Sequence, residues 1–243
     1  MEFENALTFQ QETALQMLLR LGADEFFLTT KLASLNNVVR LKIGRIYEID
    51  GEEMSGKSQI CYSIAAKFLA TKKSSKIAWI SAIPLRTDLL IKHLDMQSEN
   101  LDRIICNYPE NIGKLVGQLE WIRKFREILK IQLIFVENID ALLHDTTYEG
   151  WDLGRSHQFE IVDRLNKIAK LGVTVVITNH VSKWRGYPSP ALGNFWASQI
   201  NNRFFIEKNE HVYTISTIRN GESQAVRASF EIGDRGISDL ILS

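Results

Sequence analysis

Eight residues, Gly51 to Ser58, constrain this chain more than any other part of its sequence. They read GEEMSGKS and match the pattern G-x-x-x-x-G-K-[ST]. Gly44 to Asp50 before them is rich in β-formers, and Gln59 to Leu69 after them is apolar at helical period. A phosphate-binding loop requires this order of strand, loop and helix, because glycines let successive N–H groups face phosphate oxygens and the helix N-terminus attracts anions. The sequence therefore predicts a nucleotide-binding α/β domain.

The residue types in this loop also predict its ligand. Lys57 is expected to reach the β- and γ-phosphates, and the Ser58 hydroxyl to contact Mg²⁺, which needs few protein oxygens besides phosphate and water. A glycine turn that opens a helix without a ligand is the alternative. The residues expected to bind ATP are Gly51, Glu52, Glu53, Met54, Ser55, Gly56, Lys57 and Ser58.

A second element of such a site is an apolar strand that ends in an acid. Leu133 to Glu137 reads LIFVE, with Glu137 at the position where a carboxylate organises the waters of Mg²⁺. Asp140 follows three residues later as a second candidate, with a surface or helix-capping role as its alternative. We assign the metal role to Ser58 and Glu137.

Short apolar runs alternate with helical patterns along the middle of the chain. Strands are expected at Lys76 to Ser81, Gln132 to Glu137 and Val173 to Thr178, and helices at Leu115 to Leu129 and Phe159 to Leu171. This βα repetition predicts a mostly parallel central sheet flanked by helices.

The two ends of the chain differ from this core. After Asn201, β-branched residues surround the turn-like sequence Arg219 to Glu222, which predicts a C-terminal antiparallel β extension. At the other end, Phe9 to Leu21 has helical spacing and is followed by Gly22. We therefore divide the chain into residues 1–27, an N-terminal linker and oligomerisation helix, and residues 28–243, the ATP-binding core.

Charge and cysteine content limit the functions open to the chain. Lys plus Arg and Asp plus Glu both total 29, so contact with nucleic acid requires a local basic patch. Cys61 and Cys106 lack zinc-site spacing and are expected to be buried thiols in a reducing compartment. No signal peptide or apolar run of membrane-spanning length is visible, which predicts an intracellular protein outside the membrane.

Several segments together resemble one family. Gly44 to Leu69, GRIYEIDGEEMSGKSQICYSIAAKFL, resembles the core of RecA-type recombinases of the archaeal RadA and eukaryotic branch, where Gln-Ile-Cys after the loop is distinctive. Leu133 to Leu142 and Val173 to Val181 resemble two further strands of that family, the second leading into its second DNA-binding loop. Pro190 to Arg203 resembles the segment after that loop. The resemblance implies a RecA-like P-loop core that uses ATP and Mg²⁺.

Two positions depart from the recombinase pattern. Ile83 occupies or adjoins the position of the glutamate that polarises the attacking water, and such a group contributes about 10²- to 10⁴-fold to a rate. Hydrolysis should therefore be slow unless Glu52, Glu53 or a partner subunit substitutes. His180 stands where the family has a glutamine that senses the γ-phosphate; a simple hydrogen-bonded histidine at a strand end is the alternative.

The resemblance also marks candidate contacts with DNA. The expected loop Ser182 to Ser189 contains the aromatic and cationic residues that stack on bases and bind phosphates in single-strand binders. These residues are Lys183, Trp184, Arg185 and Tyr187. Contact with a partner protein is the alternative, since the same residue types anchor interfaces. His144 to Gln158 falls where the family has its first DNA loop and offers Arg155 and His157.

Near the N-terminus, Phe3 and Ala6 have the F-x-x-A form by which recombinase subunits dock into a neighbouring subunit. Packing at the start of a helix is the alternative role for this pair. The lead-in to the family core begins near residue 28, so the order along the chain agrees with a docking motif.

Taken together, the resemblance implies a recombinase paralogue that assists homologous-recombination repair of double-strand breaks. It implies a nuclear subunit of a hetero-oligomer, with a Shu-type complex as one candidate assembly. The implied partners are other recombinase paralogues, the main recombinase and single-stranded DNA. Two rival functions are an autonomous DNA-stimulated ATPase and a catalytically inert scaffold.

Overall fold

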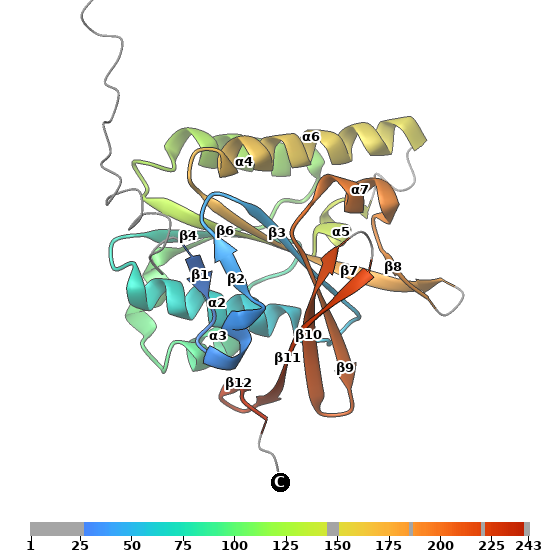
Figure 1. Ribbon diagram of the computed structural model, residues 1–243. Helices are drawn as coiled ribbons and strands as arrows, with labels where there is room; N and C mark the ends of the chain where they lie inside the picture. The colour runs from blue at the N-terminus through green and yellow to red at the C-terminus, as the bar shows by residue number, and fades with distance from the viewer. Residues whose placement is uncertain (1–26, 145–150, 185–186, 220–221, 241–243) are drawn as a thin grey trace, which may run out of the picture.

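The computed structural model describes residues 27–144, 151–184, 187–219 and 222–240. Its main sheet has the strand order β12-β11-β10-β9-β3-β7-β6-β4-β5, with β8 paired to β7 outside this order (Figure 1). The strands are β1 (Phe27–Thr29), β2 (Arg40–Lys42), β3 (Ile46–Gly51), β4 (Lys76–Ser81), β5 (Ile104–Asn107), β6 (Ile131–Glu137), β7 (Thr174–Trp184), β8 (Tyr187–Pro190), β9 (Arg203–Asn209), β10 (Val212–Arg219), β11 (Glu222–Gly233) and β12 (Gly236–Ser238). The helices are η2 (Ala33–Asn37), α2 (Lys57–Thr71), α3 (Thr87–His93), η3 (Ser98–Arg103), α4 (Ile112–Phe125), α5 (Ile139–Leu142), α6 (Trp151–Ala169) and α7 (Gly193–Gln199).

The centre of the sheet is parallel. β3 pairs in parallel with β9 and β7, and the parallel pairing continues through β6 and β4 to β5. β3, β4 and β6 are buried along nearly their whole length. This burial explains why β4 and β6 read as apolar runs rather than alternating ones, whereas β3 also carries the acids Glu48 and Asp50. β9, β10 and β11 pair antiparallel, so the expected mostly parallel core and antiparallel C-terminal extension are both confirmed.

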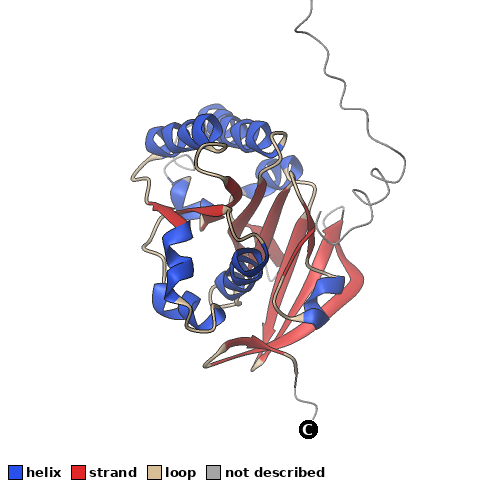
Figure 2. Cartoon of the chain, turned by 90° about the vertical axis from the view of Figure 1, so that its left-hand side faces the viewer, coloured by secondary structure: helices blue, strands red, loops and turns tan. Residues whose placement is uncertain are grey.

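Helices cover both faces of the parallel strands. On one face α2 packs Ile60, Ile64 and Phe68 into a core that also contains Trp79 and Phe135. On the other face α4 and α6 share a second core with α7 and the opposite side of the same strands. The antiparallel strands extend beyond these helical layers (Figure 2). The carboxyl ends of β3, β6 and β7 therefore meet at one edge of the sheet, where ligands bind in open α/β folds.

The start of one helix and the burial of one cysteine differ from the sequence expectations. α6 begins at Trp151, well before the predicted start at Phe159, because Gly154 and its polar neighbours conceal the apolar period. Arg155 and His157 consequently belong to a helix and not to a loop. Cys106 is exposed rather than buried, since it lies on β5 at the edge of the sheet, while Cys61 is buried as expected. The helix predicted over Phe9 to Leu21 lies outside the described residues.

Candidate functional site

The loop between β3 and α2 can be built only with glycine at both ends of its pattern. A Cβ on Gly51 would approach the Ser55 hydroxyl oxygen to 2.3 Å and the Ile206 carbonyl oxygen to 3.0 Å. Gly56 has φ +92°, and a Cβ there would lie 2.8 Å from Cδ1 of Ile232. Glycine is therefore required for the tight curl and for the left-handed residue that precedes α2.

The side chains of the loop divide into exposed and buried groups. Glu52, Glu53 and Met54 face solvent, whereas Ser55 is buried and its hydroxyl has no hydrogen-bond partner among the described residues. An unpaired buried polar group is costly. A phosphate oxygen in this loop would give the Ser55 hydroxyl a partner, which is one indication that the loop fits a phosphorylated ligand.

Lys57 lies inside the loop. Its side chain is only 6% exposed, and Nζ donates to the carbonyl oxygens of Gly51 at 2.8 Å and Glu52 at 2.7 Å. Burial lowers the pKa of Lys57 to about 8, against the opposite influence of Asp140 and other nearby carboxylates. The ammonium group is thus held at the mouth of the loop by backbone oxygens, in a position to meet a phosphate.

Ser58 and Glu137, the pair predicted to organise Mg²⁺, are in direct contact. The Ser58 hydroxyl hydrogen-bonds to Oε1 of Glu137, and Nε1 of Trp79 donates to Oε2 of the same carboxylate at 3.0 Å. The indole fixes the orientation of the buried carboxylate toward the start of α2. A hydroxyl and a carboxylate at one point are suitable ligands for Mg²⁺ and its waters. Asp140, on α5, adds a half-buried carboxylate whose Oδ1 has no hydrogen-bond partner in the part of the chain that the structure describes.

His180 lies beside the first residue of the loop. In the parallel pairing of β3 with β7, His180 is the register partner of Gly51. The side chain is half-buried, and the His180 carbonyl oxygen accepts a hydrogen bond from the N–H of Ala191 at 2.9 Å. His180 therefore occupies the edge of the sheet that carries the loop and is connected to the segment that follows β8.

The expected DNA loop has regular structure. β7 continues to Trp184 and pairs antiparallel with β8, with Lys183 opposite Pro188 and Trp184 opposite Tyr187. Residues 182–184 and 187–189 are thus paired strands, not the loop expected from the sequence, and this strand pair projects from the sheet (Figure 1). Pro188 and Pro190 make this part of the sequence read as a loop, but both are acceptable in a strand that lies at an edge. Arg185 lies outside the described residues.

Ile83 is 57% exposed and its N–H donates to the Ser81 hydroxyl at 3.3 Å, just after β4 ends. An aliphatic side chain at this position offers no base, as the sequence predicts.

A buried charge network behind the loop was not recognised from the sequence. Arg203 donates from Nε to Glu48 at 2.9 Å and from Nη2 to Asp50, and both carboxylates are fully buried. Trp196 and Asn179 donate to Oε1 of Glu48 at 2.5 and 3.0 Å. Burial raises the pKa of both acids, and that of Asp50 to about 8, with the Glu48 charge as the next cause. The available signal was the pair Glu48 and Asp50 on one face of an otherwise apolar strand.

The predicted docking residues Phe3 and Ala6 lie outside the described residues. A cavity lies at the other end of the sheet. β5 ends the strand order, and a cavity of about 300 Å³ beside it is lined by Gly113, Gly117 and Trp121 of α4. Among the described residues, no helix has the length and apolar composition needed to cross a membrane.

Comparison with known proteins gives relatives that align with most of this chain. The chain is 49% identical to RAD51-like protein 1 of Caenorhabditis briggsae, over 97% of this chain and 98% of the relative. It is 48% identical to RAD51-like protein 1 of Caenorhabditis elegans, over 94% of this chain and 96% of the relative. DNA repair protein RAD51 homolog 4 of Mus musculus is 24% identical over 78% of this chain and 63% of the relative. No protein-family model matches the chain.

Proposed function

Because this chain belongs to the RecA/RAD51 family of recombinases and their paralogues, a family of DNA repair and recombination, we propose that it is an ATP-binding paralogue that assists homologous recombination. The observation that carries the proposal is the arrangement of Lys57, Ser58 and Glu137 at the carboxyl edge of the parallel sheet. A chain that had retained the fold only as a scaffold would have no need of a buried lysine beside an aligned hydroxyl and carboxylate.

Each residue of the site has a defined part in holding the nucleotide. The backbone N–H groups of Gly51 to Ser58 and the Lys57 ammonium bind the phosphates, while Ser58 and Glu137 hold Mg²⁺ and its waters. His180, in register with Gly51, is the donor available to a terminal phosphate. In ATP this terminal phosphate is the γ-phosphate, which ADP lacks. Because Ile83 offers no base, this chain binds ATP tightly but hydrolyses it slowly.

The projecting hairpin completes the proposal. Lys183 and Trp184 end β7, Tyr187 begins β8, and His180 lies earlier on β7. Arg185, the fourth candidate residue, follows Trp184 in the sequence. We place the contact with single-stranded DNA there, where a change at the terminal phosphate can be transmitted along β7. The chain acts in the nucleus within a hetero-oligomer of recombinase paralogues, and it helps the main recombinase assemble on single-stranded DNA.

The test measures binding of MgATP and MgADP, and release of phosphate, by the purified chain with and without single-stranded DNA. Lys57→Ala is compared with Lys92→Ala, which removes an exposed lysine on α3. We expect tight MgATP binding that Lys57→Ala abolishes and Lys92→Ala preserves, with negligible phosphate release. Rapid DNA-stimulated phosphate release would replace the proposal with an autonomous ATPase, and absence of binding would replace it with a scaffold.

A further inference from the structure

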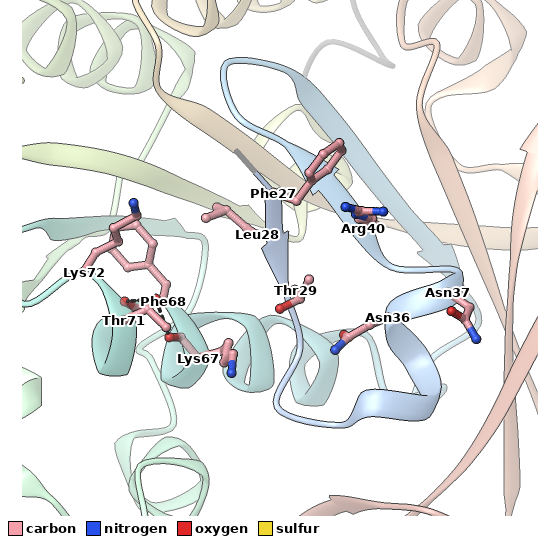
Figure 3. Close-up of a pocket in the computed structure, with 10 residues that line it drawn as sticks. All are labelled: Phe27, Leu28, Thr29, Asn36, Asn37, Arg40, Lys67, Phe68, Thr71 and Lys72. Carbon is pink, nitrogen blue, oxygen red and sulfur yellow. Dashed lines mark hydrogen bonds between the residues drawn. The ribbon is translucent and has the colours of Figure 1, made fainter. Parts of the chain in front are cut away.

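A basic groove lies on the side of the molecule that carries β1, away from the phosphate loop. It encloses about 600 Å³ between two walls (Figure 3). β1, η2 and Arg40 of β2 form one wall, and the last turns of α2 form the other. The lining residues are Phe27, Leu28, Thr29, Asn36, Asn37, Arg40, Lys67, Phe68, Thr71 and Lys72.

The charge of this groove has one sign. Arg40, Lys67 and Lys72 line it, and none of its described lining residues is acidic. Neither lysine forms an ion pair with any described residue. They are also not needed to satisfy the end of α2, because Arg103 already donates to the carbonyl oxygens of Leu69 at 2.6 Å and Lys72 at 2.9 Å. The formal charge of the whole chain is zero, so this concentration of positive charge is local.

The uncharged residues that line the groove also suit an acidic peptide segment. The Asn36 side-chain oxygen accepts hydrogen bonds from the N–H and the hydroxyl of Thr30, each at 3.0 Å, so its amide nitrogen is the group left as a donor. Leu28 and Phe68 are buried and supply an apolar floor. A floor of this kind with cationic walls suits an acidic segment that also carries apolar side chains.

Such a segment precedes the groove in the chain itself. Residues 1–26 contain five acidic residues, Glu2, Glu4, Glu12, Asp24 and Glu25, and one basic residue, Arg20. Phe27, which follows them, lines the groove. Because an extended chain spans at most about 3.6 Å per residue, Asp24 and Glu25 must lie within about 11 Å of Phe27. Tethering at this distance corresponds to an effective concentration of the order of millimolar.

We propose that this groove receives the acidic leading segment of the same chain, with Asp24 and Glu25 facing Lys67 and Lys72. The contact fixes the direction in which residues 1–26 leave the core, and with it the position from which the docking motif at Phe3 and Ala6 is presented to a partner. It adds an intramolecular interaction surface to the proposed function and does not depend on nucleotide binding.

Limited proteolysis reports on this contact directly, because Arg20 is the only trypsin site in residues 1–30. We expect Lys67→Gln/Lys72→Gln to accelerate cleavage after Arg20 about fivefold, the size expected from two partly exposed ion pairs. Asp24→Asn/Glu25→Gln should do the same, and the four changes together should have no greater effect than either pair. Rates are divided by those of synthetic peptides of residues 15–30, which corrects for changes near the cleaved bond.

Lys92→Gln/Lys170→Gln provides the control, since both lysines are exposed and lie outside the groove. Equal cleavage rates for the wild type and Lys67→Gln/Lys72→Gln would overturn the proposal. So would weaker binding of an oligothymidine by that variant without a change in cleavage, which would make the groove a nucleic-acid contact. Lys57→Ala separates this proposal from the proposed function, because it should abolish nucleotide binding and leave cleavage unchanged.

Discussion

At the scale of residues, the strand that leads into the phosphate loop carries more negative charge than its surroundings neutralise. Glu48 and Asp50 are both buried and share the single guanidinium of Arg203. Among the described residues, Oδ1 of Asp50 has no hydrogen-bond donor. The network therefore favours the protonated form of Asp50, in agreement with its raised pKa.

The raised pKa makes stability depend on pH in a defined direction. Between about pH 4 and pH 8 the unfolded chain has lost the Asp50 proton while the folded chain retains it, since the pKa rises from 3.8 to about 8 on folding. The free energy of unfolding contributed by this group therefore falls as pH rises through that window. Asp50→Asn should flatten the fall and raise stability at pH 8 by at least about 1 kcal/mol. Urea unfolding at several pH values measures this. Asp95→Asn, at an exposed carboxylate, is the control, and an unchanged slope in Asp50→Asn would contradict the prediction.

At the scale of elements, the short strand β12 packs against α2 and α3, next to the side chain of His93. Nε2 of His93 lies 2.7 Å from the Gln59 side-chain oxygen, and the buried imidazole stacks edge-on to Tyr62. Burial and the charge of Lys31 lower the pKa of His93 to about 4, so the ring is neutral near pH 7. Gly236 of β12 closes over this ring with φ +97°.

Gly236→Ala should therefore destabilise the fold by about 1 to 3 kcal/mol, through overpacking and a strained backbone. The new Cβ would lie 2.5 Å from Nε2 of His93. Gly233→Ala is a matched control three residues earlier, because a Cβ there meets nothing within 4 Å. Thermal unfolding of both variants measures the difference. Equal midpoints would show that β12 contributes little to stability.

The edge strand β5 and the adjacent α4 allow a separate test of subunit docking. A side chain at Gly117 would have open space, and glycine within a helix costs up to about 1 kcal/mol relative to alanine. Gly117→Leu should therefore raise stability, and its side chain should fill the cavity beside β5. Binding of a synthetic peptide of residues 1–12, which contains Phe3 and Ala6, should weaken at least tenfold. Gly117→Ala also gains helix propensity but fills little of the cavity beside β5, so it should preserve binding of the peptide. Calorimetric titration measures both, and unchanged binding by Gly117→Leu would place the docking surface elsewhere.

The elements that were predictable from the sequence are those whose burial leaves a pattern. β4 and β6 are buried on both faces and read as apolar runs, and the loop at Gly51 to Ser58 is specified by steric needs that only glycine meets. β5, with four residues, is too short to give a pattern, and the prolines of β8 conceal its pairing. The contact of Ser58 with Glu137 followed from motif order, whereas the ion pairs of Arg203 depend on register between distant strands.

At the scale of the whole molecule, a formal charge of zero sets how DNA binding responds to salt. With no long-range attraction from net charge, affinity depends on the few cations that touch phosphates. If the hairpin supplies Lys183 and Arg185, the slope of log affinity against log salt for single-stranded DNA should be about −1.4, at about −0.7 for each phosphate contact. Lys183→Gln should reduce its magnitude by about 0.7, and Trp184→Ala should lower affinity without altering the slope, because stacking releases no counterions.

Fluorescence anisotropy of a labelled oligothymidine between low and moderate salt gives these slopes, with Lys92→Gln as the control lysine. A slope much steeper than two contacts allow would mean that cations away from the hairpin also touch the strand, and Lys67→Gln/Lys72→Gln would then identify whether the basic groove supplies them. A slope that Lys183→Gln leaves unchanged would remove the hairpin from the DNA-binding surface. In that case the hairpin aromatics serve a partner subunit, and the link from His180 along β7 would transmit the state of the nucleotide to that partner.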